Sequence, residues 1–507
     1  MGENNLLIVA LALCREGKWD AAHKIVQQDS SQLSAWLHGV IHQEEGDLSN
    51  ARYWFNRAGR REPSPTTADE LNHFEHELIG PNAENKSCTT VPSDIDGLIR
   101  RQKFGYTLEQ VFYRSSEIHQ LEFQRVLSPQ WLYVDHESEL PEPGDFLTYE
   151  IGEESIIIVR GSDRQLRAFY NVCRHRGSQI CLEKSGNTRR FICPYHAWAY
   201  DLEGNLLSAR HMADDFEQSQ HGLHRCQVEV LEGLIFISLA SQCNAEFDQI
   251  RANLLPYLKP HGLTQTKVVH REVYPTHANW KLVVENFREC YHCMLAHPEY
   301  TRVNDYVRAG ERGSEAYQAM TEQFAEVARR KGRKSGMEYF PLPAQPHQIW
   351  RHPIQEGYKT LTRDGSPAGP LLGEFEEYDG AETASFMGAL SYLYATNDHA
   401  TTFRFTPKSP ELTEVVVSWL VREDAREGVD YDLDHLKWMW DVTTIQDTKI
   451  INDNQKGVNS SRYSSGPYSE HELSTANFIA WYLWRLSGRT DTECPTREAR
   501  FFYERMS

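Results

Sequence analysis

Two short segments of the chain combine cysteine and histidine at spacings that suit metal binding. One residue separates Cys173 from His175, two separate Cys193 from His196, and 17 residues lie between the two pairs. Two thiolates and two imidazoles can hold a [2Fe–2S] cluster with sulfur ligands on one iron and nitrogen ligands on the other. Neutral imidazoles remove negative charge, and such clusters reach roughly −150 to +300 mV. The four residues therefore predict a one-electron relay of relatively high potential.

Zinc is the alternative occupant, because two cysteines and two histidines also satisfy a tetrahedral Zn²⁺ ion. Zinc fingers usually group cysteine with cysteine and histidine with histidine, whereas each segment here mixes the two. The second segment continues through Trp198 into residues 200–205, where Glu-Gly-Asn predicts a turn between two strands. These observations favour the iron–sulfur cluster over zinc.

A second candidate metal site lies between Asn279 and Pro298. The pattern predicts a helix from Trp280 to about Ala296, and Pro298 forces the chain out of helix at that end. His292 and His297, five residues apart, can then converge on one ion. Two imidazoles and one carboxylate form the facial triad of non-haem Fe(II) oxygenases, which leaves positions open for O₂ and substrate.

Asp447 is the favoured carboxylate, because apolar residues accompany it on a predicted helix, 434–456. A carboxylate near a buried face needs a cation or another partner. Spacing alone leaves three rivals open, namely Asp441, Asp453 and Glu285. Cys290 and Cys293, beside His292, are interpreted as small buried packing residues.

The elements that must position these residues fall into three groups. Residues 1–62 predict helices, with Gly17 and Gly46 each ending one helix at an offset of 29 residues. Apolar runs at 155–160 and 233–239 bracket the Cys/His pairs, which places the ligands on loop tips of an antiparallel β domain. Beyond them, strands are predicted at 384–395, 400–406 and 413–422, and helices at 434–456 and 470–486. The predicted division is 1–62 helical extension, 63–104 linker, 105–240 cluster domain with its lead-in, and 241–507 α+β catalytic domain.

Composition limits the partners and the compartment. A net charge of −19 opposes binding to nucleic acid or to an anionic membrane, since both require a positive surface. No apolar run reaches the ~20 residues of a membrane span, and Leu6–Leu13 lacks the basic flank of a signal peptide. Ten cysteines without framework spacing fit a reducing compartment. We therefore expect a soluble, cytoplasmic protein.

Over roughly residues 105–507 the chain resembles the catalytic α-subunits of Rieske non-haem iron ring-hydroxylating oxygenases. The resemblance rests on the Cys/His pairs, on the segment 279–297 and on Gln446-Asp447. It implies that Cys173, His175, Cys193 and His196 hold a Rieske [2Fe–2S] cluster, and that His292, His297 and Asp447 hold a mononuclear Fe(II). It also implies an α+β fold: a small antiparallel β Rieske domain and a larger helix-grip-like domain with an antiparallel sheet. The preceding helical hairpins resemble tetratricopeptide repeats, although their period is shorter.

The iron motif departs from the family at one position. Most members have an aspartate three residues before the first iron histidine, bonded to that ligand and to a cluster histidine of a neighbouring subunit. This chain has Glu289, as carnitine oxygenase does, and Glu289 and Asn286 are the candidate catalytic residues of the motif. Residues 454–460 and 465–469 resemble glycine betaine oxygenase and stachydrine demethylase. The chain is therefore most similar to oxygenases of quaternary ammonium compounds.

The resemblance implies a terminal oxygenase that hydroxylates and N-demethylates a small cationic substrate, using O₂ and electrons from a separate NAD(P)H-dependent flavin/iron–sulfur reductase. A homotrimer is expected, because the family's electron path crosses subunits. Aromatic faces bind quaternary ammonium ions, but aromatics alternating on strands also form ordinary core. The candidate substrate residues are Tyr392, Tyr394, Phe403 and Phe405.

Three other functions remain as alternatives. An aromatic-ring hydroxylating dioxygenase or monooxygenase would share every metal ligand. A pure electron carrier would not need His292, His297 or the long region after the cluster. An inactive scaffold protein would be expected to have lost some of the seven ligands, all of which are present here.

Overall fold

The computed structural model describes residues 95–240, 246–304, 315–339 and 347–488, and, in the N-terminal part, residues 17–27 and 31–60 with scattered positions nearby. The chain divides into two compact units, Met1–Thr89 and Thr90–Ser507. The predicted linker, 63–104, lies largely outside the described residues, and its last part forms helix α6 (Ile95–Arg100). The finer division into domains stays a prediction.

The N-terminal unit contains the helices α2 (Trp19–Val26), α3 (Gln32–Glu44) and α4 (Leu48–Arg57). Gly17 and Gly46 have φ values of +71° and +79°, in the left-handed region that favours glycine. After each glycine, the next residue donates its N–H back to the preceding helix, at 2.9 and 3.0 Å. The next helix begins two residues after each glycine, as predicted. The likeness to tetratricopeptide repeats stays a prediction.

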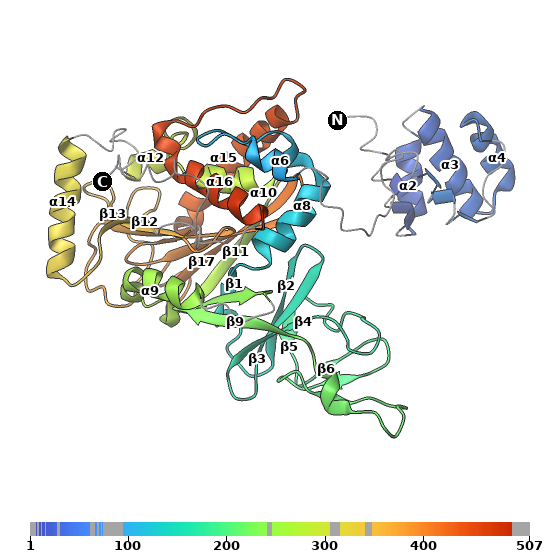
Figure 1. The fold of residues 1–507 in the computed structure, drawn as a ribbon, viewed down its shortest axis with the longest axis horizontal. Helices are drawn as coiled ribbons and strands as arrows, with labels where there is room; N and C mark the ends of the chain where they lie inside the picture. The colour runs from blue at the N-terminus through green and yellow to red at the C-terminus, as the bar shows by residue number, and fades with distance from the viewer. Residues whose placement is uncertain are drawn as a thin grey trace. The chain divides into compact units, whose positions relative to one another are not determined.

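The second unit begins with short helices and continues into antiparallel sheets (Figure 1). The lead-in elements are α6, α7 (Val111–Arg114), α8 (Ser116–Glu122) and a π-helical turn, η1 (Phe123–Leu127). A seven-stranded sheet follows in the order β1-β10-β9-β4-β3-β2-β5, formed by β1 (Leu132–His136), β2 (Asp145–Ile151), β3 (Glu154–Arg160), β4 (Leu166–Tyr170), β5 (Ser185–Asn187), β9 (Arg225–Leu231) and β10 (Leu234–Ser238). A small sheet contains β6 (Phe191–Ile192), β7 (Ala199–Tyr200) and β8 (Leu206–Ser208), and η2 (Glu137–Glu139) and η3 (Gln218–His221) are 3₁₀ turns. We call this part, β1 to β10, the cluster region.

The C-terminal region combines a second seven-stranded antiparallel sheet with helices. Its strands, in the order β11-β17-β16-β15-β14-β13-β12, are β11 (Thr266–Thr276), β12 (Gly336–Tyr339), β13 (Gln348–Pro353), β14 (Ala381–Phe386), β15 (Ser391–Ala395), β16 (Ala400–Ser409) and β17 (Leu412–Arg422). The predicted strand 384–395 is two strands of a hairpin, because Met387–Leu390 forms the turn.

Helices accompany this sheet along its length. They are α9 (Glu246–Leu258), α10 (Trp280–Phe287), α11 (Cys293–Ala296), α12 (Tyr300–Val303), α14 (Glu315–Arg330), α15 (Leu433–Val458) and α16 (Leu473–Leu486), with 3₁₀ turns η4 (Lys259–His261), η5 (Leu263–Gln265) and η6 (Glu470–Glu472). The predicted helices 434–456 and 470–486 are thus confirmed, to within a few residues at their ends. Within the described ranges, no helix has the length and apolar character needed to cross a membrane.

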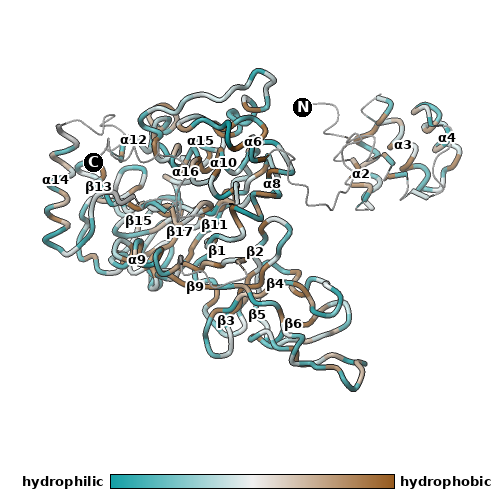
Figure 2. Tube along the Cα trace, viewed as in Figure 1, coloured by the Kyte–Doolittle hydropathy of each residue, from teal (hydrophilic) through white to brown (hydrophobic). Residues whose placement is uncertain are grey.

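Strands β13 to β17 of the C-terminal sheet are buried on both faces, which explains the long apolar stretches along strands such as β17 (Figure 2). On β15, Tyr392 and Tyr394 belong to the large core that includes α10, α15 and α16. The alternating residues Leu393 and Ala395 belong to a second core with α9. Because side chains alternate between the two faces of a strand, Tyr392 and Tyr394 lie on the face that packs against α10, α15 and α16.

A buried charged pair fixes helix α10 against distant parts of the chain. The Glu122 carboxylate, at the end of α8, accepts hydrogen bonds from Lys281 Nζ at 2.5 Å and Trp280 Nε1 at 2.8 Å. It also accepts from the Tyr482 hydroxyl of α16, at 2.5 Å. Burial lowers the pKa of Lys281, but the pair is retained in the core because each charge is hydrogen-bonded.

Candidate metal centres

The four Cys/His residues lie on two loops of the cluster region that repeat one backbone turn. In each loop the cysteine carbonyl accepts an N–H from the fourth residue on, Gly177 or Ala197, at 3.0 Å. Both of these residues have positive φ, +78° and +58°. Cys173 and Cys193 are buried, only 3 % and 2 % exposed, whereas His175 and His196 are exposed, with ring centroids 4.6 Å apart.

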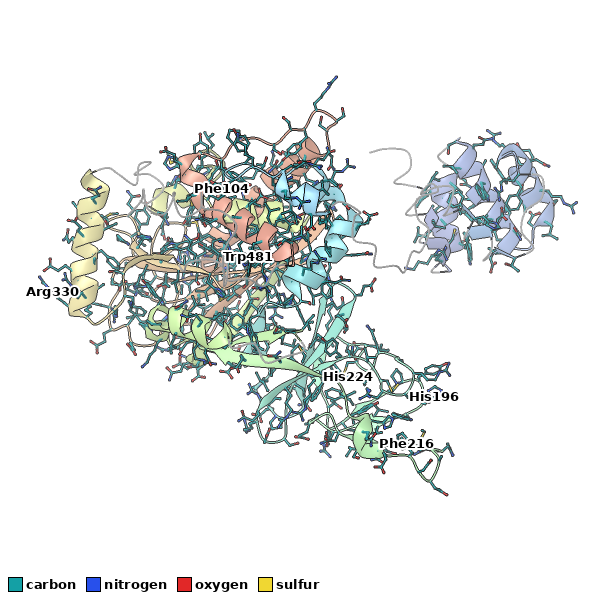
Figure 3. All side chains as sticks on the ribbon, viewed as in Figure 1. Phe104, His196, Phe216, His224, Arg330 and Trp481 are labelled. Carbon is teal, nitrogen blue, oxygen red and sulfur yellow. The ribbon has the colours of Figure 1, made fainter. Side chains whose placement is uncertain are left out.

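This donor set fits a [2Fe–2S] cluster with buried thiolates and outward-facing imidazoles. Figure 3 shows His196 at the outer end of the cluster region. His175 is held by stacking on Trp198, with ring centroids 4.9 Å apart and planes within 9°. An exposed imidazole edge is the natural exit for an electron, since the sulfur side is covered by protein.

One tyrosine contacts a thiol ligand directly. The Tyr200 hydroxyl lies 3.4 Å from Cys173 Sγ, and its oxygen accepts the Arg174 N–H at 3.0 Å. The hydroxyl hydrogen is then available for the sulfur. Hydrogen bonds to cluster sulfurs stabilise the reduced, more negative state and raise the potential.

Replacing Tyr200 by phenylalanine should lower the cluster potential by roughly 40–80 mV, because losing a hydrogen bond costs about 1–2 kcal/mol. For a one-electron couple, a tenfold change in the equilibrium constant corresponds to about 59 mV. A spectroscopic redox titration of the purified protein measures the change. Tyr195→Phe is the control, because its exposed ring stacks on His196. An unchanged potential in Tyr200→Phe would show that the hydroxyl does not act on the cluster.

The second candidate site brings three donors from two segments to one point. His292 Nε2 and His297 Nε2 are 3.1 Å apart, and Asp447 Oδ1 lies 3.4 and 3.0 Å from them. His297 and Asp447 are 1 % and 6 % exposed. The structure therefore brings together the three residues that the resemblance named.

The prediction of one continuous helix through this segment was wrong. Helix α10 ends at Phe287, and α11 starts only at Cys293. Between them, the Glu289 carboxylate accepts the backbone N–H groups of Tyr291 and His292, which replaces helical bonding. At the other end, His297 has non-helical dihedral angles before Pro298, as predicted. The break turns His292 toward His297.

Hydrogen bonds at the far nitrogens orient both imidazoles. His292 Nδ1 pairs with Glu289 Oε1 at 2.5 Å, and His297 Nδ1 donates to Gln446 Oε1 at 2.9 Å. Gln446 in turn donates to Glu299 at 2.8 Å. Such contacts fix the tautomer that leaves Nε2 free to bind a metal. The sequence indicated Gln446 only as part of a motif, although its place beside Asp447 was a signal for this role.

The three rival carboxylates are each engaged elsewhere. Asp441 accepts the Tyr274 hydroxyl at 2.6 Å. Asp453 is exposed and paired with lysines on the same helix. Glu285 is buried and accepts two tyrosine hydroxyls, at 2.9 and 3.0 Å.

The charge balance at the convergent donors fits a divalent cation. Burial lowers the pKa of His292, but hydrogen bonds to Asp447 and Glu289 outweigh it and raise the pKa to about 10. Burial raises the pKa of Asp447, yet hydrogen bonds from both imidazoles lower it overall. The Asp447 carboxylate thus attracts positive charge to the point where the three donors meet, and the donor set is that of a non-haem Fe(II) triad.

A cavity lined by both aromatic and polar side chains adjoins these donors. Its lining includes Phe287, Tyr300, Tyr394, Phe403 and Trp440, together with the Asn286 and Glu289 side chains and the metal-binding candidates. Tyr394 stacks on Trp440, with ring centroids 3.9 Å apart. Of the four candidate substrate residues, Tyr394 and Phe403 line the cavity, whereas Tyr392 and Phe405 pack in the core beside it.

Two cysteines also line this cavity. A hydrogen bond with Cys290 and burial raise the pKa of Cys293 well above its usual range. A neutral thiol agrees with the interpretation of Cys293 as a packing residue.

Comparisons with known proteins place the chain in a family. Residues 130–225 match the Rieske [2Fe-2S] domain, and residues 263–488 match the ring hydroxylating alpha subunit (catalytic domain). The chain belongs to the catalytic α-subunits of Rieske non-haem iron oxygenases, and it is an oxidoreductase with a Rieske cluster and a mononuclear iron.

Within that family, the chain is similar to several characterised oxygenase subunits. It is 37 % identical over 419 residues to the glycine betaine monooxygenase oxygenase subunit of Chromohalobacter salexigens, covering 79 % of this chain and 90 % of that one. It is 39 % identical over 205 residues to the carnitine monooxygenase oxygenase subunit of Escherichia coli, covering 39 % of this chain and 53 % of that one. The fold matches the quaternary ammonium Rieske monooxygenase CntA in complex with L-carnitine, with a TM-score of 0.57 and 22 % identity over 77 % of this chain and 97 % of that one.

Proposed function

We propose that this protein is a terminal oxygenase that hydroxylates an N-methyl carbon of a small quaternary ammonium substrate. Hydroxylation there gives a hemiaminal that collapses to formaldehyde and the demethylated amine. The aromatic cavity beside His292, His297 and Asp447 carries the proposal, and similarity to glycine betaine monooxygenase over most of its length supports it. When bound, the cluster supplies electrons singly and the iron activates O₂.

The proposed ligands are the residues described above. Cys173, His175, Cys193 and His196 would hold the cluster, and His292, His297 and Asp447 would hold the iron. We propose that Glu289 orients His292 and links it to an imidazole of a cluster domain. The Nδ2 atom of Asn286 lies 3.4 Å from His292 Nε2. Asn286 would therefore place a polar group beside the iron-binding nitrogen of His292.

The cavity has the chemistry that a quaternary ammonium ion needs. Such an ion makes no strong hydrogen bonds, and each aromatic face contributes up to ~2 kcal/mol when water is excluded. Tyr300, Tyr394 and Trp440 present three rings, with Tyr300 and Trp440 centroids 5.7 Å apart. Tyr394 and Phe403 are the sequence-predicted members of this proposed cage.

A buried carboxylate behind the cage favours a cation. Glu382, on β14, is 2 % exposed and accepts the Asn304 amide at 3.0 Å. The same amide nitrogen donates to the Tyr300 hydroxyl at 2.7 Å. Burial raises the pKa of Glu382 to about 7, against hydrogen bonds from Asn304 and Trp350 that lower it.

Glu382→Gln should weaken binding of a quaternary ammonium substrate about tenfold above pH 7, since a charge pair several ångströms apart is worth on the order of 1–2 kcal/mol at intermediate dielectric. Glu382 is neutral below its pKa and ionised above it. The KM of the wild type for a permanently charged substrate should therefore fall as pH rises from 6 to 8. The KM of Glu382→Gln should not change over the same pH range. A pH-independent KM ratio between the two proteins would contradict the role of Glu382.

We further propose that copies of the chain form a ring trimer. Exposed apolar side chains flank both centres: Tyr291, Met294 and Leu295 next to the iron ligands, and Leu182, Ile192 and Tyr195 near the cluster loops. Leu295 is 93 % exposed. Two different patches on one chain pair head to tail, and a head-to-tail interface closes into a ring. Inter-subunit electron transfer has been described for the quaternary ammonium Rieske monooxygenase whose fold this chain matches, which supports an assembly of this kind.

A separate NAD(P)H-dependent flavin/iron–sulfur reductase is the electron donor we propose, because the sequence has no dinucleotide fingerprint of its own. The cytoplasm is the proposed location, where a reducing environment keeps thiols such as the half-buried Cys181 and the buried Cys226 free.

A single-turnover experiment tests the proposed function. Iron-replete protein is reduced anaerobically, mixed with O₂ and glycine betaine, carnitine, stachydrine or an aromatic acid, and assayed for cluster oxidation and formaldehyde. Formaldehyde stoichiometric with turnover, for a quaternary amine only, is the expected result. A cis-diol from the aromatic acid, with no formaldehyde from any amine, would favour the alternative of aromatic-ring hydroxylation instead.

A further inference from the structure

Three histidines meet inside the N-terminal unit, outside both centres described above. His38 and His42 lie one turn apart on α3, and His23 lies on α2. One ring nitrogen from each lies within 4.8 Å of the other two, and the Nε2 atoms of His23 and His38 are 2.7 Å apart. His38 and His42 are buried, and His23 is partly exposed.

Neighbouring side chains hold the outer edges of this cluster. The Glu45 carboxylate accepts from His42 Nδ1 at 2.8 Å, which directs the other nitrogen of that ring toward the cluster. The Gln27 amide lies 3.3 Å from His23 Nδ1. His38 is fixed by stacking on Trp54, with ring centroids 4.0 Å apart. A carboxylate on the far nitrogen of a ligand histidine is the usual support of protein metal sites.

We propose that His23, His38 and His42 form a zinc-binding site that joins α2 to α3, with water or an external donor as fourth ligand. Zn–N bonds of 2.0–2.1 Å place tetrahedral donors roughly 3.3 Å apart. That separation lies between the 2.7 Å and 4.8 Å of the present arrangement, so small side-chain rotations close the site. Three imidazoles with water as the fourth ligand form an established type of tetrahedral zinc site, although imidazole also binds other transition metals.

The proposed zinc site takes all its protein donors from one unit of the chain. All its donors lie in the unit Met1–Thr89, whereas the iron candidates lie in Thr90–Ser507. A metal bound between two helices stabilises the folded form of this unit in proportion to its affinity. The site therefore belongs to the assembly or stability of the N-terminal unit.

The experiment uses full-length, cluster- and iron-replete protein. Zinc is titrated in competition with a chromophoric chelator, and bound zinc is counted by elemental analysis. We expect one zinc per chain beyond the iron, with an X-ray absorption spectrum of nitrogen and oxygen ligands only. His38→Gln and His42→Gln should each lower the affinity for this zinc at least about 100-fold. Glu45→Gln should lower it about tenfold, within the range for a supporting carboxylate.

Two controls separate this site from the iron site and from surface binding. His224→Gln removes an exposed histidine elsewhere and should leave the zinc unchanged. Asp447→Ala should also retain it. Far-UV circular dichroism checks that the His38 and His42 variants are folded; His42→Gln is the milder of the two because His38 also stacks on Trp54. Absence of the extra zinc in the wild type, or its loss in Asp447→Ala but not in His42→Gln, would overturn the proposal.

Discussion

Asp447→Ala is expected to lose the mononuclear iron and at least about 1000-fold in single-turnover product, while the cluster spectrum stays intact. Three donor atoms converge within 3.4 Å of one another, and Asp447 supplies the one carboxylate oxygen among them. Metal ions contribute several kcal/mol to such reactions, and each 1.4 kcal/mol is about tenfold in rate. Iron analysis and the visible absorption of the cluster, measured on the same sample, check both halves of the prediction.

Asp453→Ala is the matched control, because it removes an aspartate from the same helix. Asp453 is exposed and paired with Lys449 and Lys456, and surface pairs of this kind contribute little. This variant should keep the iron and the activity. Retention of iron in Asp447→Ala, or its loss in Asp453→Ala, would reassign the carboxylate ligand.

Glu289→Gln is expected to slow cluster oxidation in a single turnover about 100-fold with both metals still bound. The Glu289 carboxylate pairs with His292 Nδ1 and also accepts the backbone N–H groups of Tyr291 and His292. Glutamine keeps the size and one acceptor but removes the negative charge, and changes to such supporting residues cost 10–100-fold. Stopped-flow absorption of the prereduced protein with substrate and O₂ measures the rate.

Glu289→Asp distinguishes charge from reach. Aspartate keeps the charge one methylene further from His292, so a rate close to that of the wild type means that the carboxylate acts only as an acceptor. A marked change in either direction means that the longer glutamate gates electron arrival. Equal rates in Glu289→Gln and the wild type would remove Glu289 from the electron path altogether.

Short-range patterns in the sequence predicted much of the candidate site. The Cys/His pairs lie on loop tips of an antiparallel sheet because the apolar runs around them are strands. His297 lies at a helix end because Pro298 follows it. These outcomes depend on local chemistry, which neighbouring residues in the sequence determine.

Other features depended on contacts that spacing does not reveal. The break after Phe287 arises from a side chain bonding its own backbone, which overrides helical periodicity. Trp440 precedes Asp447 by seven residues on α15, so both lie on one face, and that spacing was a signal that could have identified it. Tyr300 reaches the same cavity from a separate short helix, α12, and no pattern in the sequence indicated it.

The buried charge at Glu122 has a consequence for the order of folding. Its partners Lys281 and Tyr482 are 159 and 360 residues away in the chain. A ribosome makes the first partner long before the last, and contacts of such high sequence separation form slowly. Until α16 has been synthesised and docked, Glu122 lacks the hydrogen bond from Tyr482. The contacts that hold α10 in place are then incomplete. Maturation of the histidine site that follows α10 is therefore expected only after α16 has left the ribosome.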